Sequence, residues 1–250
     1  AAPRSASPAV QRLCDTLKAA GDTKTKAWFD GYMKGSITHY GVKMAGIRSA
    51  LRAWWKDEDL RGLPITAQKA LAIEFFDHPM FEEKMAGTLA LAEQIGFADA
   101  PAADPSSDDA SPEASGLTRH DLPALRAVLA DGRLAEWSSV DWFCVKVLRH
   151  IVERDPLAAR EVASWKAEDG TAATSADGGL WVRRAAAVSF VYAAKHGDAS
   201  PPNFPGFLDM LEGVADALVQ RTDERFMQTA SGWLLREMWL PPAPRAEERG

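Results

Sequence analysis

A tryptophan and an aspartate stand four residues apart where a helical run begins, in the segment Glu136–Trp142. Positions i and i+4 share one face of an α-helix, so Trp137 and Asp141 can address the same small volume. A carboxylate held there can stabilise positive charge or activate water, and an aromatic face attracts cations. The alternative is structural, since Ser138-x-x-Asp141 is also a capping-box pattern whose carboxylate satisfies backbone N–H groups.

Two later stretches combine tryptophan with arginine. Trp181 opens a helical stretch and is followed by Arg183 and Arg184, which point about 100° apart, so at most one of them faces a given ligand. Trp233 belongs to an apolar stripe, and Arg236 follows three residues later. Each also fits an ordinary role, Trp233 as a core residue and Arg236 as a surface ion-pair partner.

Composition describes an ordinary globular chain of 250 residues, 46% hydrophobic and 26% charged. No apolar run approaches the roughly 18 residues of a membrane span, so we expect a soluble protein without membrane contact. Cys14 and Cys144 lie within apolar helical patterns, which disfavours a disulfide framework and fits a reduced intracellular compartment. The two cysteines and five histidines show no metal-ligand spacing, so no metal is expected.

The formal net charge of −6 argues against a strongly basic nucleic-acid binder, but the excess is local. Residues 97–118 contain five acidic residues, no Lys or Arg, and much Ala, Pro and Ser. This composition predicts a disordered acidic insertion. The rest of the chain is nearly neutral, so it can carry a local basic groove. We interpret residues 241–250 as a C-terminal tail.

Helical periodicity dominates the remaining chain, and no convincing period-2 alternation occurs. Helices arriving in pairs of about forty residues predict an all-α, HEAT-like helical-repeat solenoid in a single domain, residues 5–240. Such solenoids present a concave face that suits a long partner, either a nucleic acid or a protein. The expected helices lie at about 8–20, 22–34, 44–54, 64–76, 80–95, 121–130, 139–153, 156–168, 180–195, 205–220 and 224–238.

One cationic row stands out on the third expected helix. Arg48, Arg52 and Lys56 recur at i, i+4 and i+8 and therefore share a face. The row fits either an ordinary solvated helix face or a surface that faces phosphates.

Four motifs in register resemble the AlkD family of DNA alkylation repair glycosylases, which are HEAT-like repeat proteins. Their order and approximate spacing agree over about residues 10–240. The motifs are Tyr32-Met33-Lys34 with Gly41, Trp137-x-x-x-Asp141, Leu180-Trp181-Val182-Arg183-Arg184-Ala185-Ala186, and Gly232-Trp233-x-Leu235-Arg236-Glu237.

The resemblance implies that Trp137 and Trp233 flank the lesion nucleotide and that Asp141 is the catalytic aspartate between them. It implies excision of purines alkylated at N3 or N7 in duplex DNA, without turning the base into a pocket, unlike most glycosylases. Such a purine is cationic and leaves readily, so the carboxylate has to stabilise the oxocarbenium-like sugar or position water. No lysine matches a cleft position, so we expect an abasic site as the product, with no lyase step and no cofactor.

Arg184 matches the arginine that binds the DNA backbone near the lesion, while Tyr32 and Arg236 match residues that line the cleft. An arginine on a phosphate fixes register without reading sequence. We therefore expect a monomeric protein that binds double-stranded DNA containing alkylated bases, inside a prokaryotic cytoplasm or a DNA-containing eukaryotic compartment. The residues expected to face DNA are Tyr32, Lys34, Arg48, Trp181, Arg184 and Arg236.

Two positions depart from the family pattern and keep a rival hypothesis open. Glu136 stands where a second tryptophan is common, and Ser138 replaces a common aspartate. Glu136 would add a negative charge near the phosphates. The rival is a non-catalytic helical-repeat module that binds DNA or a protein; a basic concave face supports either DNA function, whereas an apolar or acidic one favours a protein partner.

Overall fold

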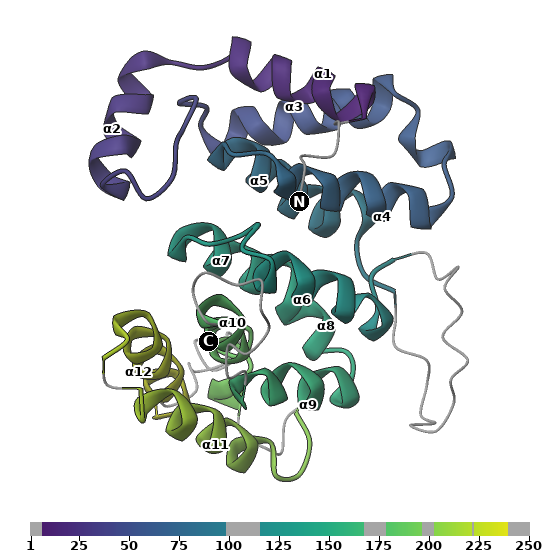
Figure 1. The fold of residues 1–250 in the computed structure, drawn as a ribbon. Helices are drawn as coiled ribbons and strands as arrows, with labels where there is room; N and C mark the ends of the chain where they lie inside the picture. The colour runs from purple at the N-terminus through teal and green to yellow at the C-terminus, as the bar shows by residue number, and fades with distance from the viewer. Residues whose placement is uncertain (1–6, 99–115, 168–178, 197–202, 222, 240–250) are drawn as a thin grey trace, which may run out of the picture.

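The described part of the chain is all-helical, as the sequence predicts. The computed structural model describes residues 7–98, 116–167, 179–196, 203–221 and 223–239 (Figure 1). Within these ranges the chain forms helices and two isolated bridges but no β-strand. None of the helices found there is both long and apolar enough to cross a lipid bilayer.

The helices of the first half begin where the sequence places them. Ser7 accepts a hydrogen bond from the Val10 amide, and the predicted N-cap Asp22 accepts one from the Thr25 amide at 2.7 Å, so both side chains satisfy donors that a helix start leaves unpaired. The elements are α1 (Pro8–Ala19), α2 (Thr23–Met33), α3 (Met44–Asp57), α4 (Ile65–Glu74) and α5 (Phe81–Leu89), which continues through a π turn at Ala90–Ile95.

In the second half, one helical run starts earlier than predicted. It starts at Trp137 rather than at residue 139, and a π turn, Cys144–Leu148, joins its two α segments. The elements are α6 (Leu122–Ala130), α7 (Trp137–Phe143), α8 (Arg149–Val152), α9 (Pro156–Ser164), α10 (Leu180–Val188), α11 (Phe207–Val219) and α12 (Arg225–Trp239).

Five helices stack on one another in chain order, and we call them the inner row. They are α3, α5, α7, α10 and α12, each packed against the next. The intervening helices cover this row: α1 packs on α3, α4 on α5, α6 and α9 on α10, and α11 on α12. This is the predicted helical-repeat arrangement, and it brings residues far apart in sequence onto neighbouring helices.

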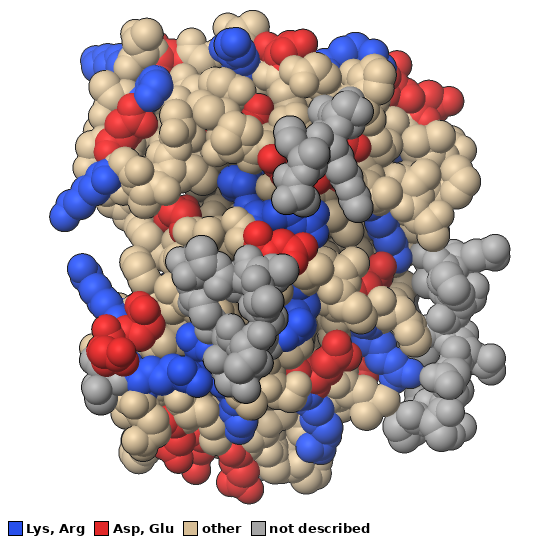
Figure 2. All heavy atoms as spheres, viewed as in Figure 1, with Lys and Arg blue, Asp and Glu red and all other residues tan. Residues whose placement is uncertain are grey.

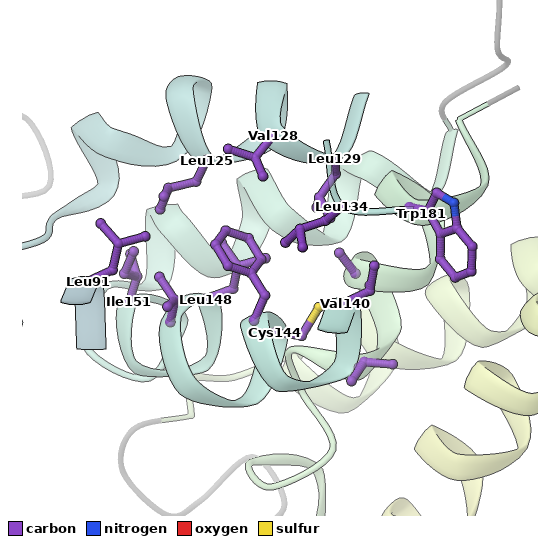
Figure 3. Close-up of a cluster of buried hydrophobic side chains, with 14 of the residues drawn as sticks. Leu91, Leu125, Val128, Leu129, Leu134, Val140, Cys144, Leu148, Ile151 and Trp181 are labelled. Atoms are coloured by element: carbon purple, nitrogen blue, oxygen red, sulfur yellow. The ribbon is translucent and has the colours of Figure 1, made fainter. Parts of the chain in front are cut away.

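The core runs continuously through both halves. Figure 3 shows Leu91 together with Leu148 and Ile151, across the contact between the π turns that follow α5 and α7. Both cysteines are free and buried in this core, as their apolar patterns predict.

Helix α2 belongs neither to the inner row nor to the helices that cover it, and it is held by the loop that follows it. Of its residues only Met33 is buried. The buried carboxylate of Glu82 accepts hydrogen bonds from the amides of Tyr40, Gly41 and Val42 at 2.8–3.0 Å. Gly41 has φ +94°, and a Cβ there would lie 2.2 Å from the carbonyl oxygen of Asp22. The loop therefore requires glycine, and it holds the first turn of α2 beside α5.

The predicted disordered insertion has structured ends, which corrects its boundaries. Leu117 donates its amide to the Gly96 carbonyl at 2.8 Å, and its own carbonyl accepts the Ala98 amide at 3.2 Å. Leu117 is buried, because its side chain belongs to the core. Residues 99–115 and the predicted tail 241–250 lie outside the described residues.

Candidate functional site

The N-terminus of α7 is capped by Glu136, not by Ser138. The Glu136 carboxylate accepts the amides of Ser138 and Ser139, the second at 2.9 Å. Burial raises the pKa of Glu136, and these backbone donors oppose that rise. The capping-box interpretation of Ser138 and Asp141 is therefore wrong. Glu136 is buried, so the expected extra negative charge near phosphates is instead turned inward onto the helix end.

Asp141 forms a two-point ion pair with Arg184 of α10. Arg184 Nε donates to Asp141 Oδ1, and Nη2 donates to Oδ2, each at 2.8 Å. The arginine side chain is 5% exposed and the aspartate side chain 16% exposed. Such a planar, bidentate contact fixes the direction of the carboxylate while part of it faces solvent.

Arg184 also binds α12 through its third guanidinium nitrogen. Its Nη1 donates to the Phe226 carbonyl at 2.7 Å and to Thr229 Oγ1 at 3.1 Å. Every guanidinium nitrogen is thus engaged inside the protein. In this structure Arg184 positions Asp141 and ties α7 to α12, and its expected contact with a DNA phosphate stays a prediction.

Both candidate tryptophans lie one helical turn from groups that Arg184 holds. Trp137 precedes Asp141 by four residues on α7, and Trp233 follows Thr229 by four residues on α12. A turn rises about 5.4 Å and returns to the same face. Both rings are half-buried and pack against the core. Arg184 therefore links the helix of Asp141 and Trp137 to the helix of Trp233, while a catalytic role for these three residues stays a prediction.

The electrostatics of Asp141 reflect two opposing effects. Burial raises the pKa of its carboxyl, and the hydrogen bonds and charge of Arg184 lower it. Burial is the larger effect, so the pKa remains above its ordinary value. Arg184 is the group that limits this rise and favours a charged carboxylate.

An exposed aromatic pair on α2 continues the site. Tyr32 makes an edge contact with Trp137, with ring centroids 6.2 Å apart, although 105 positions separate them in the chain. Tyr32 also stacks on Trp28, which the sequence analysis did not identify. Its signal was available, because Trp28 and Tyr32 share a face at i and i+4. Lys34 lies just beyond, in a left-handed conformation with φ 51°.

The remaining predicted DNA contacts differ in accessibility. Arg236 is 63% exposed and pairs with the adjacent Glu237. Arg48 pairs with Glu93 at 2.8 Å, so its charge is partly neutralised. Trp181 is 5% exposed and packs on Phe226 at 5.3 Å between ring centroids, which leaves no ring face for DNA. Trp181 is thus a packing residue, contrary to the expectation.

Surface charge is mixed, as the near-neutral body predicts. Figure 2 shows Lys and Arg side chains interspersed with Asp and Glu, with several Lys and Arg gathered at the middle of the viewed face. The acidic net charge therefore coexists with local basic regions.

Among the residues that the structure describes, one group of potential metal ligands comes from α1, the turn after α4, and α5. Donor atoms of Cys14, His78 and Glu83 lie within 4.8 Å of one another. Cys14 Sγ is 3.6 Å from His78 Nδ1, while Glu83 accepts the Tyr40 hydroxyl and the Met80 amide. These hydrogen bonds account for the geometry without an ion. The cluster was not predicted from sequence because 64 residues separate Cys14 from His78.

The sequence model of one protein family, described as DNA alkylation repair enzyme, matches residues 13–239. The chain belongs to the DNA alkylation repair enzyme family. The match includes α2, the inner row and all the site residues named above. Membership gives the chain a role in DNA repair, with DNA as its partner. Among curated proteins, no match to this member of the family was found.

Proposed function

We propose that this protein is a monofunctional DNA glycosylase that hydrolyses the N-glycosidic bond of N3- or N7-alkylated purines in duplex DNA, without base flipping. The proposal includes a monomeric enzyme that acts inside the cell and needs neither metal nor cofactor. The observation that carries it is the Asp141 carboxylate, oriented by Arg184 and partly exposed beside Trp137.

The reaction needs few groups because the alkylated purine already carries a positive charge. The C1′–N bond breaks, and its electron pair stays on the purine, whose charge it cancels. Asp141 stabilises the oxocarbenium-like sugar electrostatically. Water then forms the new C1′–O bond and gives its proton to Asp141 or to solvent, which leaves free base and an abasic site.

The tryptophans supply the second contribution. Trp137 and Trp233 offer ring faces to the cationic sugar or base, and each such contact contributes about 0.5–2 kcal/mol. Exposed cations, Lys34 and Arg236, suit phosphates. Arg184 acts through Asp141 and is a positioning residue in this proposal.

A non-catalytic DNA-binding module is the second candidate. It is favoured by the two hydrogen bonds from Arg184 to both carboxylate oxygens of Asp141. An ion pair with a purely structural role would have the same geometry. Each oxygen nevertheless keeps a further lone pair for a water or a sugar.

The test incubates the protein with a duplex that carries one 7-methylguanine and measures released base and alkali-labile sites. We expect the wild type to release 7-methylguanine and Asp141→Asn to release at least about a hundredfold less under single-turnover conditions. Asn keeps the shape of the side chain and one acceptor for Arg184. If neither protein releases base but both shift the duplex in a low-salt gel, the chain is a DNA-binding module.

A further inference from the structure

Helix α2 exposes two stacked aromatic rings. Trp28 is 62% exposed and Tyr32 57% exposed, and their ring centroids lie 5.4 Å apart with an interplanar angle of 6°. Large apolar side chains that gather on a surface mark an interaction site more often than isolated ones do. Since α2 buries only Met33, these rings contribute little to its anchoring.

The pair is continuous with the proposed active site. Tyr32 contacts Trp137 edge to face at 6.2 Å, so Trp28, Tyr32 and Trp137 form a row that leads from the start of α7 out along α2. We call these three residues the aromatic row. A DNA strand advances about 3.4 Å per nucleotide, so the row is roughly three nucleotides long.

The surroundings of the row suit a polyanion that approaches closely. Lys24 lies one turn before Trp28, and Lys34 follows Tyr32; both are exposed, and neither forms an ion pair with any residue that the structure describes. A Cβ built on Gly31 would meet no atom within 4 Å. The helix surface beside the rings is therefore open to a backbone.

We propose that Trp28 and Tyr32 bind the DNA strand that flanks the lesion, within about three nucleotides of it. Deoxyribose and base edges lie against the rings, while Lys24 and Lys34 face the phosphates. The inference rests on the proposed function for placing the lesion at Trp137. Trp28 is then a DNA-binding residue outside the catalytic group.

The experiment measures affinity by fluorescence anisotropy for a duplex with a central tetrahydrofuran abasic-site analogue. We expect Trp28→Ala to weaken binding at least about fivefold, because aromatic contacts to nucleotides contribute on that scale. Trp28→Phe should keep most of the affinity. Val219→Ala is the control, since Val219 is 46% exposed at the end of α11, which carries none of the proposed DNA contacts.

A second experiment uses shortened duplexes. In one, only one or two nucleotides remain on the first side of the lesion, and in the other only one or two remain on the opposite side. The wild type should lose affinity with one of the shortened duplexes, and Trp28→Ala should bind that duplex as the wild type does. If Trp28→Ala loses the same affinity relative to the wild type with every duplex, Trp28 has a structural role and the inference is overturned. Wild-type affinity of Trp28→Ala for the full duplex also overturns it.

The outcomes separate the two proposals. At saturating protein, the control Val219→Ala should release 7-methylguanine at the wild-type rate, because Val219 lies outside both proposed sites. A wild type that binds DNA but releases no base refutes the proposed glycosylase activity. The proposal that Trp28 and Tyr32 bind the flanking strand is unaffected by that result. If sedimentation shows that Trp28→Ala changes oligomeric state and not DNA affinity, the rings contact a second copy and the inference fails.

Discussion

Arg184 and Asp141 are joined by two parallel hydrogen bonds of 2.8 Å although 43 residues separate them. The arginine belongs to α10 and the aspartate to α7, which are neighbours in the inner row. The pair therefore couples the geometry of the proposed catalytic carboxylate to the packing of the helices. Substitutions of either residue should change stability and activity together unless they are designed to separate them.

Asp141→Ala is a poor test of catalysis by itself, because it should lower stability as well as activity. It leaves the buried Arg184 guanidinium without its anion, which costs about 3 kcal/mol of unfolding free energy. Asp141→Asn should cost less. The double variant Asp141→Asn with Arg184→Gln should regain most of the stability, measured by urea unfolding, while base release stays lost. Activity in the double variant would remove Asp141 from the mechanism.

Arg184 should also set the acid limit of the reaction. Catalysis needs a charged Asp141, so the rate falls as pH falls through the pKa of this carboxyl. Because Arg184 lowers that pKa and burial raises it, Arg184→Gln should raise the pKa further and move the acid limb to higher pH. The single-turnover rate against pH measures this. Lys34→Ala serves as the control, and an acid limb that stays in place in Arg184→Gln would contradict the assignment.

The loop after α2 should be sensitive to its buried carboxylate. Glu82→Ala leaves three amides without their acceptor, which should lower the unfolding free energy by at least about 3 kcal/mol. Gly41→Ala should also destabilise, since its Cβ would overlap the Asp22 carbonyl. Urea unfolding compares both with Gly31→Ala, where space is open. Equal stability of all three variants would refute this account of the loop.

Lys34 should show opposite effects on stability and DNA binding. Its left-handed conformation costs a lysine about 1 kcal/mol that glycine avoids, so Lys34→Gly should be more stable. The same change removes a cation from the proposed DNA surface. The slope of log affinity against log salt concentration should then fall by about 1. Lys18→Gly, on α1, provides a comparison; an unchanged slope for Lys34→Gly would place this lysine outside the interface.

Local signals predicted the helices well. Asp22 caps α2 as expected, because its contact lies three residues away and depends on little else. The cap at Glu136 was missed since glutamate is not among the favoured capping residues, while the nearby serine fits a common pattern. Short-range hydrogen bonding was thus accessible from sequence wherever residue preferences are strong.

Long-range partners were less accessible. The types and positions of Asp141, Arg184 and Trp233 suggested a site, but the ion pair that removes Arg184 from the surface arises from the packing of α7, α10 and α12. Trp181 was misjudged for the same reason. A helix carries a tryptophan equally well on either face, and only its neighbours decide which face is buried.

Phe97 and Leu117 form a bridge. Because this bridge fixes both residues, the positions of the neighbouring helices do not depend on the residues between them. This bridge holds the two ends of the intervening segment together, next to the end of α5 and the start of α6. The length and composition of that segment can therefore drift during evolution without displacing either helix. For the same reason, this junction is a suitable insertion site. A tag for dye labelling or a second protein domain can be inserted there while the helices keep their arrangement.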